Sequence, residues 1–179
     1  ASASNNQARN LPFVFSTDDT ALVELTNQLM RVWVSDALIT RVAVTTAVTN
    51  GTFDTDIASW TDNDEASATS VWQAGGYMAL TGNGTNAAIR DQQVTVAAGD
   101  QNKEHALRIV IERGPVAFKV GSTAGGDEYV GETTLDTGYH SLAFTPTGNF
   151  HIRLMSTLKR LVLVDSVTVE AAGVMTLPA

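Results

Sequence analysis

The chain has 179 residues, with 19 Asp and Glu against 11 Lys and Arg, and no Cys. This length suffices for one domain with a hydrophobic core, and the formal net charge of −8 argues against a nucleic acid or an anionic membrane as partner. The lack of Cys excludes disulfides, thiolate metal sites and a Cys nucleophile, and no apolar run approaches the ~20 residues of a membrane-spanning helix. The 23 Thr and 19 Val favour strands, because β-branched side chains suit a pleated sheet.

Residues 1–10 are mostly small and polar, and we expect them to be disordered, because they bury too little apolar surface to offset the entropy of ordering. Residues 11–48 are dense in apolar and β-branched side chains. Turn-forming residues interrupt this segment at 16–19, 26–28 and 35–36. We therefore predict a segment rich in β-hairpins.

A helix is the alternative for part of this segment. Leu22, Leu25, Leu29 and Trp33 recur at helical spacing and would line one face. We favour the hairpin, since the sequence from Arg31 onward is rich in β-forming residues and the turn signal before it falls at hairpin length.

From Asn50 onward, short segments with strand character follow one another at intervals of roughly ten residues, separated by Gly, Asn and Asp. This spacing indicates an antiparallel sandwich or barrel and not an alternation of strands and helices. The predicted strands are 66–73, 77–81, 87–96, 105–112, 116–120, 128–135, 139–145, 149–155 and 160–170.

Apolar and polar residues alternate along several of these segments, for example 107–111, 116–120 and 150–154. Successive side chains of a strand point to opposite faces, so each segment offers one apolar face to a shared core. The predicted fold class is therefore all-β, an antiparallel β-sandwich (jelly roll) preceded by the β-hairpin-rich segment.

The order of motifs after residue 48 resembles the jelly-roll carbohydrate-binding modules of the family 4/9 type. In these modules an NGxFE-like start precedes a Trp, a QxV strand leads to a Gly turn, and a DxV strand closes the sandwich. The matching segments are Asn50–Asp54, Trp60, Gly76–Leu80, Gln92–Val96, Gly99, Gly138–Thr145 and Val164–Val167. Asp54 stands where Glu is usual, and His105 begins a segment where an aromatic residue often follows the Gly turn. The resemblance implies a carbohydrate-binding jelly roll over residues 49–171.

The flanking segments resemble bacteriophage and prophage tail proteins of a structural, nozzle-like kind. The similarity lies in Leu11–Ser16, Ala21–Leu25 and Met30–Val32, and in Thr176–Pro178, which would resume the same fold. It implies that residues 11–48 and 172–179 belong to a parent virion protein in which the jelly roll is an insertion. We accordingly expect the chain to be a fragment of a longer protein.

The carbohydrate-binding-module resemblance also implies a structural calcium ion, held by the acids of the early and late motifs, Asp54 and Asp165. Ca²⁺ takes six to eight oxygen ligands, and turns can add carbonyl groups to two carboxylates. Asp165 also interrupts an apolar alternation that includes Leu163 and Val167, which would place its carboxylate on the inward face. An inward carboxylate needs a cation or hydrogen-bond donors; the alternative is that Asp165 caps backbone amides at a strand end.

Sugar binding would use aromatic rings that stack on a pyranose. Trp72, Tyr77 and Tyr129 lie beside Gly-rich turns, where a ring could remain exposed. A second predicted surface is a charged outer face, which comprises Arg108, Glu112, Lys119, His151 and Arg153. The structural alternative is that the aromatic residues belong to the core and that the charged residues are only solvated.

The sequence contains no enzymatic motif. His105, His140 and His151 are scattered without zinc-binding spacing, and the Gly-rich segment 121–126 lacks the Lys and the helix of a P-loop. A glycosidase would need a pair of carboxylates. The available ones lie in polar turns, where solvation explains them: Asp62, Asp64, Glu65, Asp127 and Glu128. We therefore predict that the chain is not an enzyme.

The sequence leaves two functions open. The first is a structural part of a phage or prophage tail, located in the virion and able to form oligomers through its parent protein, whose jelly roll contacts glycans or other virion proteins. The second is a carbohydrate-binding module of a secreted bacterial glycoside-active protein. Neither function involves a nucleic acid or a membrane.

Overall fold

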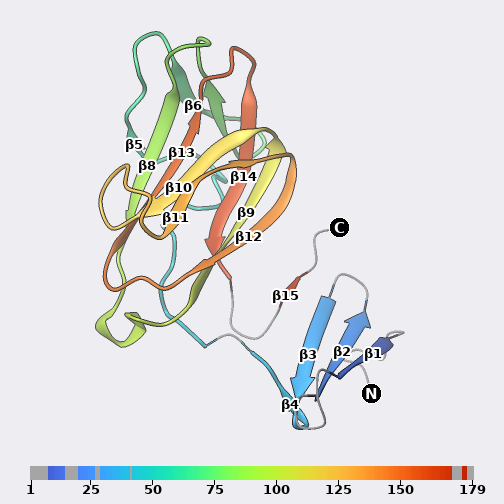
Figure 1. Ribbon diagram of the computed structural model, residues 1–179. Helices are drawn as coiled ribbons and strands as arrows, with labels where there is room; N and C mark the ends of the chain where they lie inside the picture. The colour runs from blue at the N-terminus through green and yellow to red at the C-terminus, as the bar shows by residue number, and fades with distance from the viewer. Residues whose placement is uncertain (1–7, 15–19, 27–28, 41, 171–174, 177–179) are drawn as a thin grey trace. The chain divides into compact units, whose positions relative to one another are not determined.

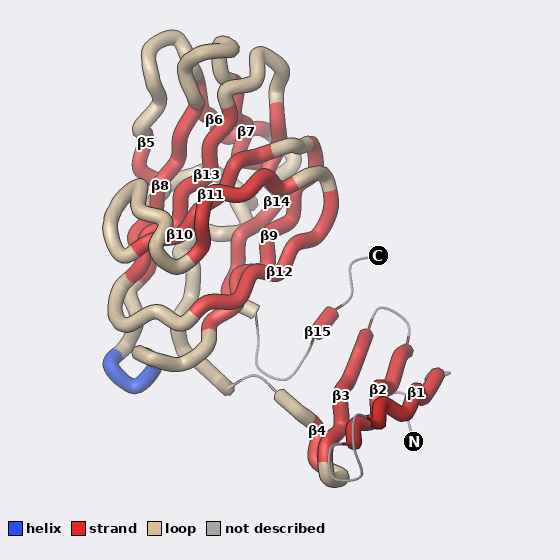
Figure 2. The backbone as a smooth tube through the Cα atoms, viewed as in Figure 1, coloured by secondary structure: helices blue, strands red, loops and turns tan. Residues whose placement is uncertain are grey.

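The computed structural model describes residues 8–14, 20–26, 29–40, 42–170 and 175–176. These residues form antiparallel sheets joined by turns, and they include one short 3₁₀ helix, η2 (Ala98–Asp100), drawn in blue in Figure 2. The prediction of an all-β fold is confirmed.

The chain divides into two compact units. The first comprises residues 1–43 and 171–179, and the second comprises residues 44–170. Each unit has sheets of its own, and each is described here by itself.

The first unit contains one antiparallel sheet with the order β1–β2–β3–β15, and β4 also pairs with β3. β2 and β3 are joined as a hairpin that ends with Thr26 opposite Leu29, so the hairpin prediction is confirmed and the helical alternative is wrong. The turn before β4 has positive φ at Ser35 (49°) and Asp36 (61°), as tight hairpin turns require. The strands are β1 (Arg9–Val14), β2 (Thr20–Thr26), β3 (Leu29–Val34), β4 (Ala37–Leu38) and β15 (Met175–Thr176).

The two ends of the chain meet in this sheet. β1 begins at Arg9, so the last two residues of the segment predicted to be disordered lie in a strand, and residues 1–7 are outside the described residues. Of the predicted return segment 172–179, residues 175–176 are described, and they pair with β3. The sheet therefore combines strands that precede and follow the second unit in the sequence.

The second unit consists of two five-stranded antiparallel sheets (Figure 1). Sheet B has the order β11–β10–β13–β8–β5, and sheet C has the order β12–β9–β14–β7–β6. All nine strands predicted for this region are present, and the strand that was not predicted is β5. The strands are β5 (Thr61–Asp62), β6 (Thr69–Gln73), β7 (Tyr77–Thr81), β8 (Ala88–Val94), β9 (His105–Arg113), β10 (Val116–Gly121), β11 (Val130–Leu135), β12 (Gly138–Phe144), β13 (Phe150–Ser156) and β14 (Val162–Val169).

The two sheets share one hydrophobic core. Ile109 of β9, Phe118 of β10 and Ile152 of β13 are fully buried, as the alternation predicts. Their neighbours Arg108 and Lys119 are only partly buried, on the outer faces. Burying one such apolar side chain contributes roughly 1.5–3 kcal/mol, so this core is the main source of stability of the second unit.

Strand β14 corrects the predicted orientation of Asp165. Val164 is fully buried in the core, whereas Leu163 lies outside the core cluster. The pairing with β9 is irregular between Val164 and Ser166, which makes Asp165 the additional residue of a β-bulge. The bulge shifts the alternation by one position, so Val167 again faces the core. The prediction of one continuous alternation with Asp165 inward is therefore wrong, and Asp165 is partly exposed.

Candidate functional site

The loop that starts at Asn50 has a strained backbone that its surroundings hold in place. Asn50 and Phe53 have positive φ angles of 47° and 54°, which residues other than glycine adopt at a cost. Nδ2 of Asn50 donates to the backbone oxygens of Asp56 and Ala58 and to the Asp56 carboxylate, at 2.7–3.2 Å. Phe53 is fully buried, and its ring centroid lies 5.7 Å from that of Trp60. These contacts fix the loop in one conformation.

This loop orients an exposed indole at the edge of sheet C. The Phe53 carbonyl accepts a hydrogen bond from Nε1 of Trp72 at 2.7 Å. Trp72 lies on the edge strand β6, and 37% of its surface is exposed. The ring is therefore presented to solvent in a fixed orientation, so a ligand that stacks on it would cost little side-chain entropy.

The loop also presents polar groups on both sides of Phe53, whose carbonyl binds the Trp72 indole. Thr52 and Asp54 are exposed, and the Thr52 hydroxyl donates to the Asp54 carboxylate (Oγ1–Oδ2 3.0 Å). A Cβ at Gly76 would lie 3.8 Å from the carbonyl oxygens of both Thr52 and Phe53, so the loop passes closely over the turn before β7. Gly76 has φ +85°, a conformation that favours glycine. We call Thr52, Asp54 and Trp72 the edge site.

Tyr77, the second predicted aromatic residue, is close to Trp72 in sequence but lies on the opposite face of sheet C. In the β6–β7 hairpin, Trp72 is opposite Met78, whereas Tyr77 is opposite Gln73. Met78 is fully buried in the core. Because adjacent positions of a strand face opposite ways, Tyr77 is on the outer face of sheet C and cannot form one stacking platform with Trp72.

Tyr129, the third predicted aromatic residue, lies away from both. Its ring packs against the core and stacks on Phe144, with the centroids 5.8 Å apart. Its hydroxyl lies 3.0 Å from Oγ1 of Thr147 and also accepts a hydrogen bond from the Thr147 amide. These contacts assign Tyr129 a structural role between the start of β11 and the loop after β12.

The two predicted calcium ligands come from segments that contact each other. The Gly51 carbonyl accepts a hydrogen bond from the Val167 amide at 2.7 Å, which joins the loop carrying Asp54 to the strand carrying Asp165. The Asp165 carboxylate accepts a hydrogen bond from the Ser166 hydroxyl at 3.1 Å. In the part of the chain that the structure describes, no three His, Asp or Glu side chains gather as a metal site. A calcium ion would therefore have two carboxylates, Asp54 and Asp165, and loop carbonyl groups as its protein ligands. Calcium binding remains a prediction.

The charged residues predicted to share one outer face belong to two. Arg108 and Glu112 are on β9 of sheet C, whereas Lys119 of β10 and His151 and Arg153 of β13 are on sheet B. The outer faces of two packed sheets point in opposite directions. The prediction of a single charged surface is therefore wrong.

On sheet B the charges form a row across neighbouring strands. Arg153 is opposite Lys119 on one side and Asp91 on the other. Arg153 forms a bidentate ion pair with Asp91 (Nε–Oδ1 2.7 Å, Nη2–Oδ2 2.5 Å), and Nζ of Lys119 lies 3.8 Å from Glu132. The hydrogen bonds to Asp91 raise the pKa of Arg153 above its ordinary value. Each charge of this row has a partner within it, so the row serves the sheet and not a ligand.

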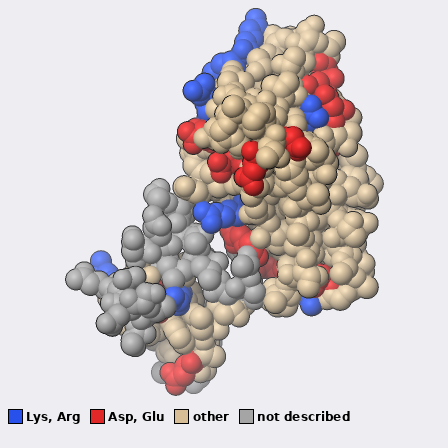
Figure 3. Space-filling model, turned by 180° about the vertical axis from the view of Figure 1, so that it is seen from behind, with Lys and Arg blue, Asp and Glu red and all other residues tan. Residues whose placement is uncertain are grey.

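The charged side chains that are visible in Figure 3 are distributed in small groups. On that face, uncharged surface separates the basic groups from one another, and some of them adjoin patches of Asp and Glu. A surface that binds a nucleic-acid backbone usually presents Lys and Arg clustered on one face or in a stripe. The described residues show no such stripe on this face. Among the described residues, no helix has the length and apolar character needed to cross a membrane.

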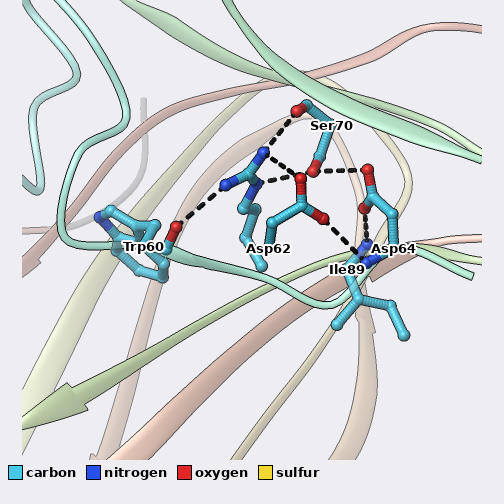
Figure 4. Close-up of polar contacts among 6 residues, drawn as sticks. Trp60, Asp62, Asp64, Ser70 and Ile89 are labelled. Atoms are coloured by element: carbon cyan, nitrogen blue, oxygen red, sulfur yellow. Dashed lines mark hydrogen bonds and ion pairs between the residues drawn. The ribbon is translucent and has the colours of Figure 1, made fainter.

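Arg90 of β8, which the sequence pattern did not single out, ties sheet B to sheet C (Figure 4). Its guanidinium donates to the hydroxyl and the carbonyl of Ser70 on β6, both at 2.6 Å. It also donates to the Trp60 carbonyl at 3.0 Å and to the Asp62 carboxylate at 2.9 Å. The sequence could have pointed to Arg90, because an Arg inside an otherwise buried strand needs several hydrogen-bond acceptors.

The carboxylates considered as a glycosidase pair are engaged in similar structural bonds. Asp64 accepts hydrogen bonds from the Ser70 hydroxyl at 2.8 Å and from the Ile89 amide at 2.6 Å (Figure 4). Glu65 accepts from the backbone amide of Ala87 at 2.6 Å. Backbone hydrogen bonds lower the pKa of the exposed Glu128 carboxyl. Asp64 and Glu65 therefore fasten loops to neighbouring backbone and side-chain donors.

A second polar cluster fastens the first residues of this unit. Asp100 is buried and accepts hydrogen bonds from the hydroxyl and the amide of Thr45, both at 2.7 Å, which lower the pKa of its carboxyl. His105 is also buried, with Nδ1 2.9 Å from the Lys103 carbonyl and Nε2 2.8 Å from the Thr46 hydroxyl. A carbonyl only accepts, so Nδ1 carries the proton. His105 is thus a satisfied core residue.

Comparison with known proteins gives no relative. No family model matches the chain, and no curated protein matches it. The resemblance to carbohydrate-binding modules and to phage tail proteins therefore rests on the sequence motifs quoted above.

Proposed function

We propose that the chain is a non-catalytic part of a bacteriophage or prophage tail protein, and that its second unit is a jelly-roll carbohydrate-binding module that adheres to surface glycans. The observation that carries the recognition part is the edge site, where the exposed Trp72 ring is held by the Phe53 carbonyl next to the exposed Thr52 and Asp54. Sugar-binding surfaces need an apolar ring face for the pyranose and nearby polar groups for its hydroxyls.

The position of the second unit in the chain supports the structural part of the proposal. β3 precedes the sandwich, β15 follows it, and the two pair in one sheet. A module whose preceding and following strands belong to one host sheet is suited to display on a larger assembly. Display in several copies would raise avidity by ~10²–10⁴ without any new contact.

The engagement of the acidic side chains supports the absence of catalysis. Asp64 and Glu65 accept hydrogen bonds that close loops, and Asp62 is paired with Arg90. A general acid must carry a proton that it can give to the substrate. Carboxylates that already accept hydrogen bonds or pair with an arginine are poor candidates for that role.

Glycan binding is tested by replacing Trp72 with Ala and probing a glycan array. We expect the parent chain to bind, and the affinity of the variant to fall at least tenfold, because an aromatic contact of this kind contributes about 1.5 kcal/mol or more. The matched control is Val71→Ala, the neighbouring exposed residue of β6 on the other face, which should retain the parent affinity.

Two results would contradict the recognition part. One is an array that stays silent with a folded chain, which leaves a structural spacer. The other is binding that survives in Trp72→Ala. The parent protein is tested by the neighbouring genes: we expect tail genes, whereas genes of secreted glycoside-active enzymes would favour the second function.

Calcium belongs to the proposal as a structural ion, for which Asp54 and Asp165 would supply carboxylate oxygens. With bound calcium, EDTA should lower the melting temperature of the chain, since an ion that binds only the folded state stabilises it. The effect should disappear in Asp165→Asn, whereas Asp127→Asn, an exposed acid on another loop, should respond like the parent. Identical melting with Ca²⁺ and with EDTA would remove calcium from the proposal.

A further inference from the structure

The outer face of sheet C carries an arginine that lies over an aromatic ring. The guanidinium carbon of Arg108 lies 5.2 Å from the centroid of the Tyr139 ring, and 46% of the Tyr139 surface is exposed. Arg108 is opposite Ser141 of β12, and Tyr139 is opposite Val110 of β9. The pair is therefore diagonal across two adjacent strands, on the face turned away from the core.

A cation that lies over an aromatic ring is attracted by the ring's quadrupole, and this contact uses none of its N–H groups in hydrogen bonds. Arg108 has no hydrogen bond and no ion pair to another side chain among the residues that the structure describes. Its five N–H donors lie in the guanidinium plane, and that planar fork matches the two oxygens of a carboxylate. The Tyr139 ring thus holds in place a cation whose donors are unused.

The surroundings of this pair are polar and mostly uncharged. Arg108 is also opposite Thr168 of β14, and Val110 is opposite Ser166 of the same strand, so two hydroxyl groups of β14 lie beside Arg108. Glu112, two positions beyond Val110 on β9, is an acidic residue of this face, and Glu104 and Glu170 lie just outside the ends of β9 and β14. Among the described residues, no ion pair joins Glu112 to Arg108.

We infer that Arg108 and Tyr139 form a subsite for a carboxylate-bearing sugar, such as a uronic or sialic acid residue of a glycan. The carboxylate would accept hydrogen bonds from the paired N–H groups of Arg108, the sugar ring would lie against Tyr139, and the hydroxyls of Thr168 and Ser166 on β14 would bind the sugar hydroxyls. This inference rests on the proposed glycan binding and names its chemistry.

The subsite is separate from the edge site. Tyr139 is on β12 and Trp72 is on β6, the two opposite edges of sheet C. Four strand spacings of ~4.8 Å separate them, roughly 19 Å across the sheet. A glycan chain of several sugars would be needed to reach both, so the two sites can be tested independently.

The test measures binding of a glucuronic-acid disaccharide, its neutral methyl ester and free acetate to the full chain by isothermal titration calorimetry. We expect the acid to bind at least tenfold more tightly than the ester, and this preference to weaken as salt rises, because the site is exposed. The preference should vanish in Arg108→Met and fall in Arg108→Lys, which keeps the charge and loses the planar fork. Tyr139→Phe should keep it.

The control is Arg113→Met, an exposed arginine of the same strand, which should bind like the parent chain. Equal affinity for acid and ester, or a preference that survives in Arg108→Met, would overturn the inference. Acetate that binds as tightly as the disaccharide would reduce the subsite to a simple anion site and would also overturn it. An acid preference that is lost in Arg108→Met, together with glycan-array binding that survives in Trp72→Ala, would uphold the subsite while contradicting the edge site. Binding of neutral glycans that depends on Trp72 alone, with no acid preference, would uphold the edge site and contradict the subsite.

Discussion

Replacing Ile109 with Asp is expected to unfold the unit formed by residues 44–170. Ile109 is fully buried on β9, between His140 of β12 and Val167 of β14. The substitution removes roughly 1.5–3 kcal/mol of apolar burial. It also places a carboxylate where no donor awaits it, which costs several kcal/mol more. The sum approaches the whole stability of a typical domain, about 5–15 kcal/mol.

Urea unfolding followed by circular dichroism measures this effect. The matched control is Val110→Asp, the next residue of β9, which points to the outer face and is partly exposed. It should change the free energy of unfolding by less than about 1 kcal/mol, because water still reaches the new carboxylate. If Ile109→Asp melted like the parent chain, or Val110→Asp unfolded it, the assignment of inner and outer faces would be wrong.

The contrast between β9 and β14 shows what the sequence could predict of the fold. In β9 the alternation around Ile109 has one solution, because Arg108 and Glu112 share one face of the strand and can only be outside. In β14 the run Leu161–Val164 is apolar at every position, so its phase is open, and the bulge at Asp165 adds a residue that no alternation reveals. Bulges arise from pairing with the neighbouring strand, which a single sequence does not contain.

The same limit applies to the edge site. The Gly-rich turn before β7 indicated that a nearby ring could be exposed, and Trp72 is exposed. What fixes that ring is the carbonyl of Phe53, a residue 19 positions away with a left-handed backbone, and neither feature follows from local sequence. The side of the strand on which Tyr77 lies depends on the hairpin register, which a shift of one residue would reverse.

Polar partners distant in sequence were the least predictable part. Asp91 and Arg153 are 62 residues apart, and Arg153 was assigned to a solvated outer face. The assignment to the outer face agrees with the register, but the pairing partner depends on which strand lies next to β13. Charges on adjacent strands are matched by topology, so their energetic role becomes visible only when the sheet order is known.

Replacing Arg153 with Met is therefore expected to destabilise the second unit strongly. Asp91 is 4% exposed, and its remaining side-chain donor is Nδ2 of Asn63 at 2.8 Å. Removing one partner of a buried ion pair leaves an uncompensated charge, at a cost of about 3–5 kcal/mol. The free energy of unfolding in urea should fall by that amount. Lys119→Met is the control: its ion pair with Glu132 is longer and its partner is half exposed, so the change should be about 1 kcal/mol or less.

The double variant Asp91→Asn with Arg153→Met separates the cost of the orphaned charge from the net value of the pair. Asp91→Asn alone removes the bidentate partner of Arg153, which lies opposite Lys119, so it should also destabilise the unit. In the double variant neither buried charge remains, and the loss should be clearly smaller than the sum of the two single losses. Strictly additive losses would mean that the two side chains act independently.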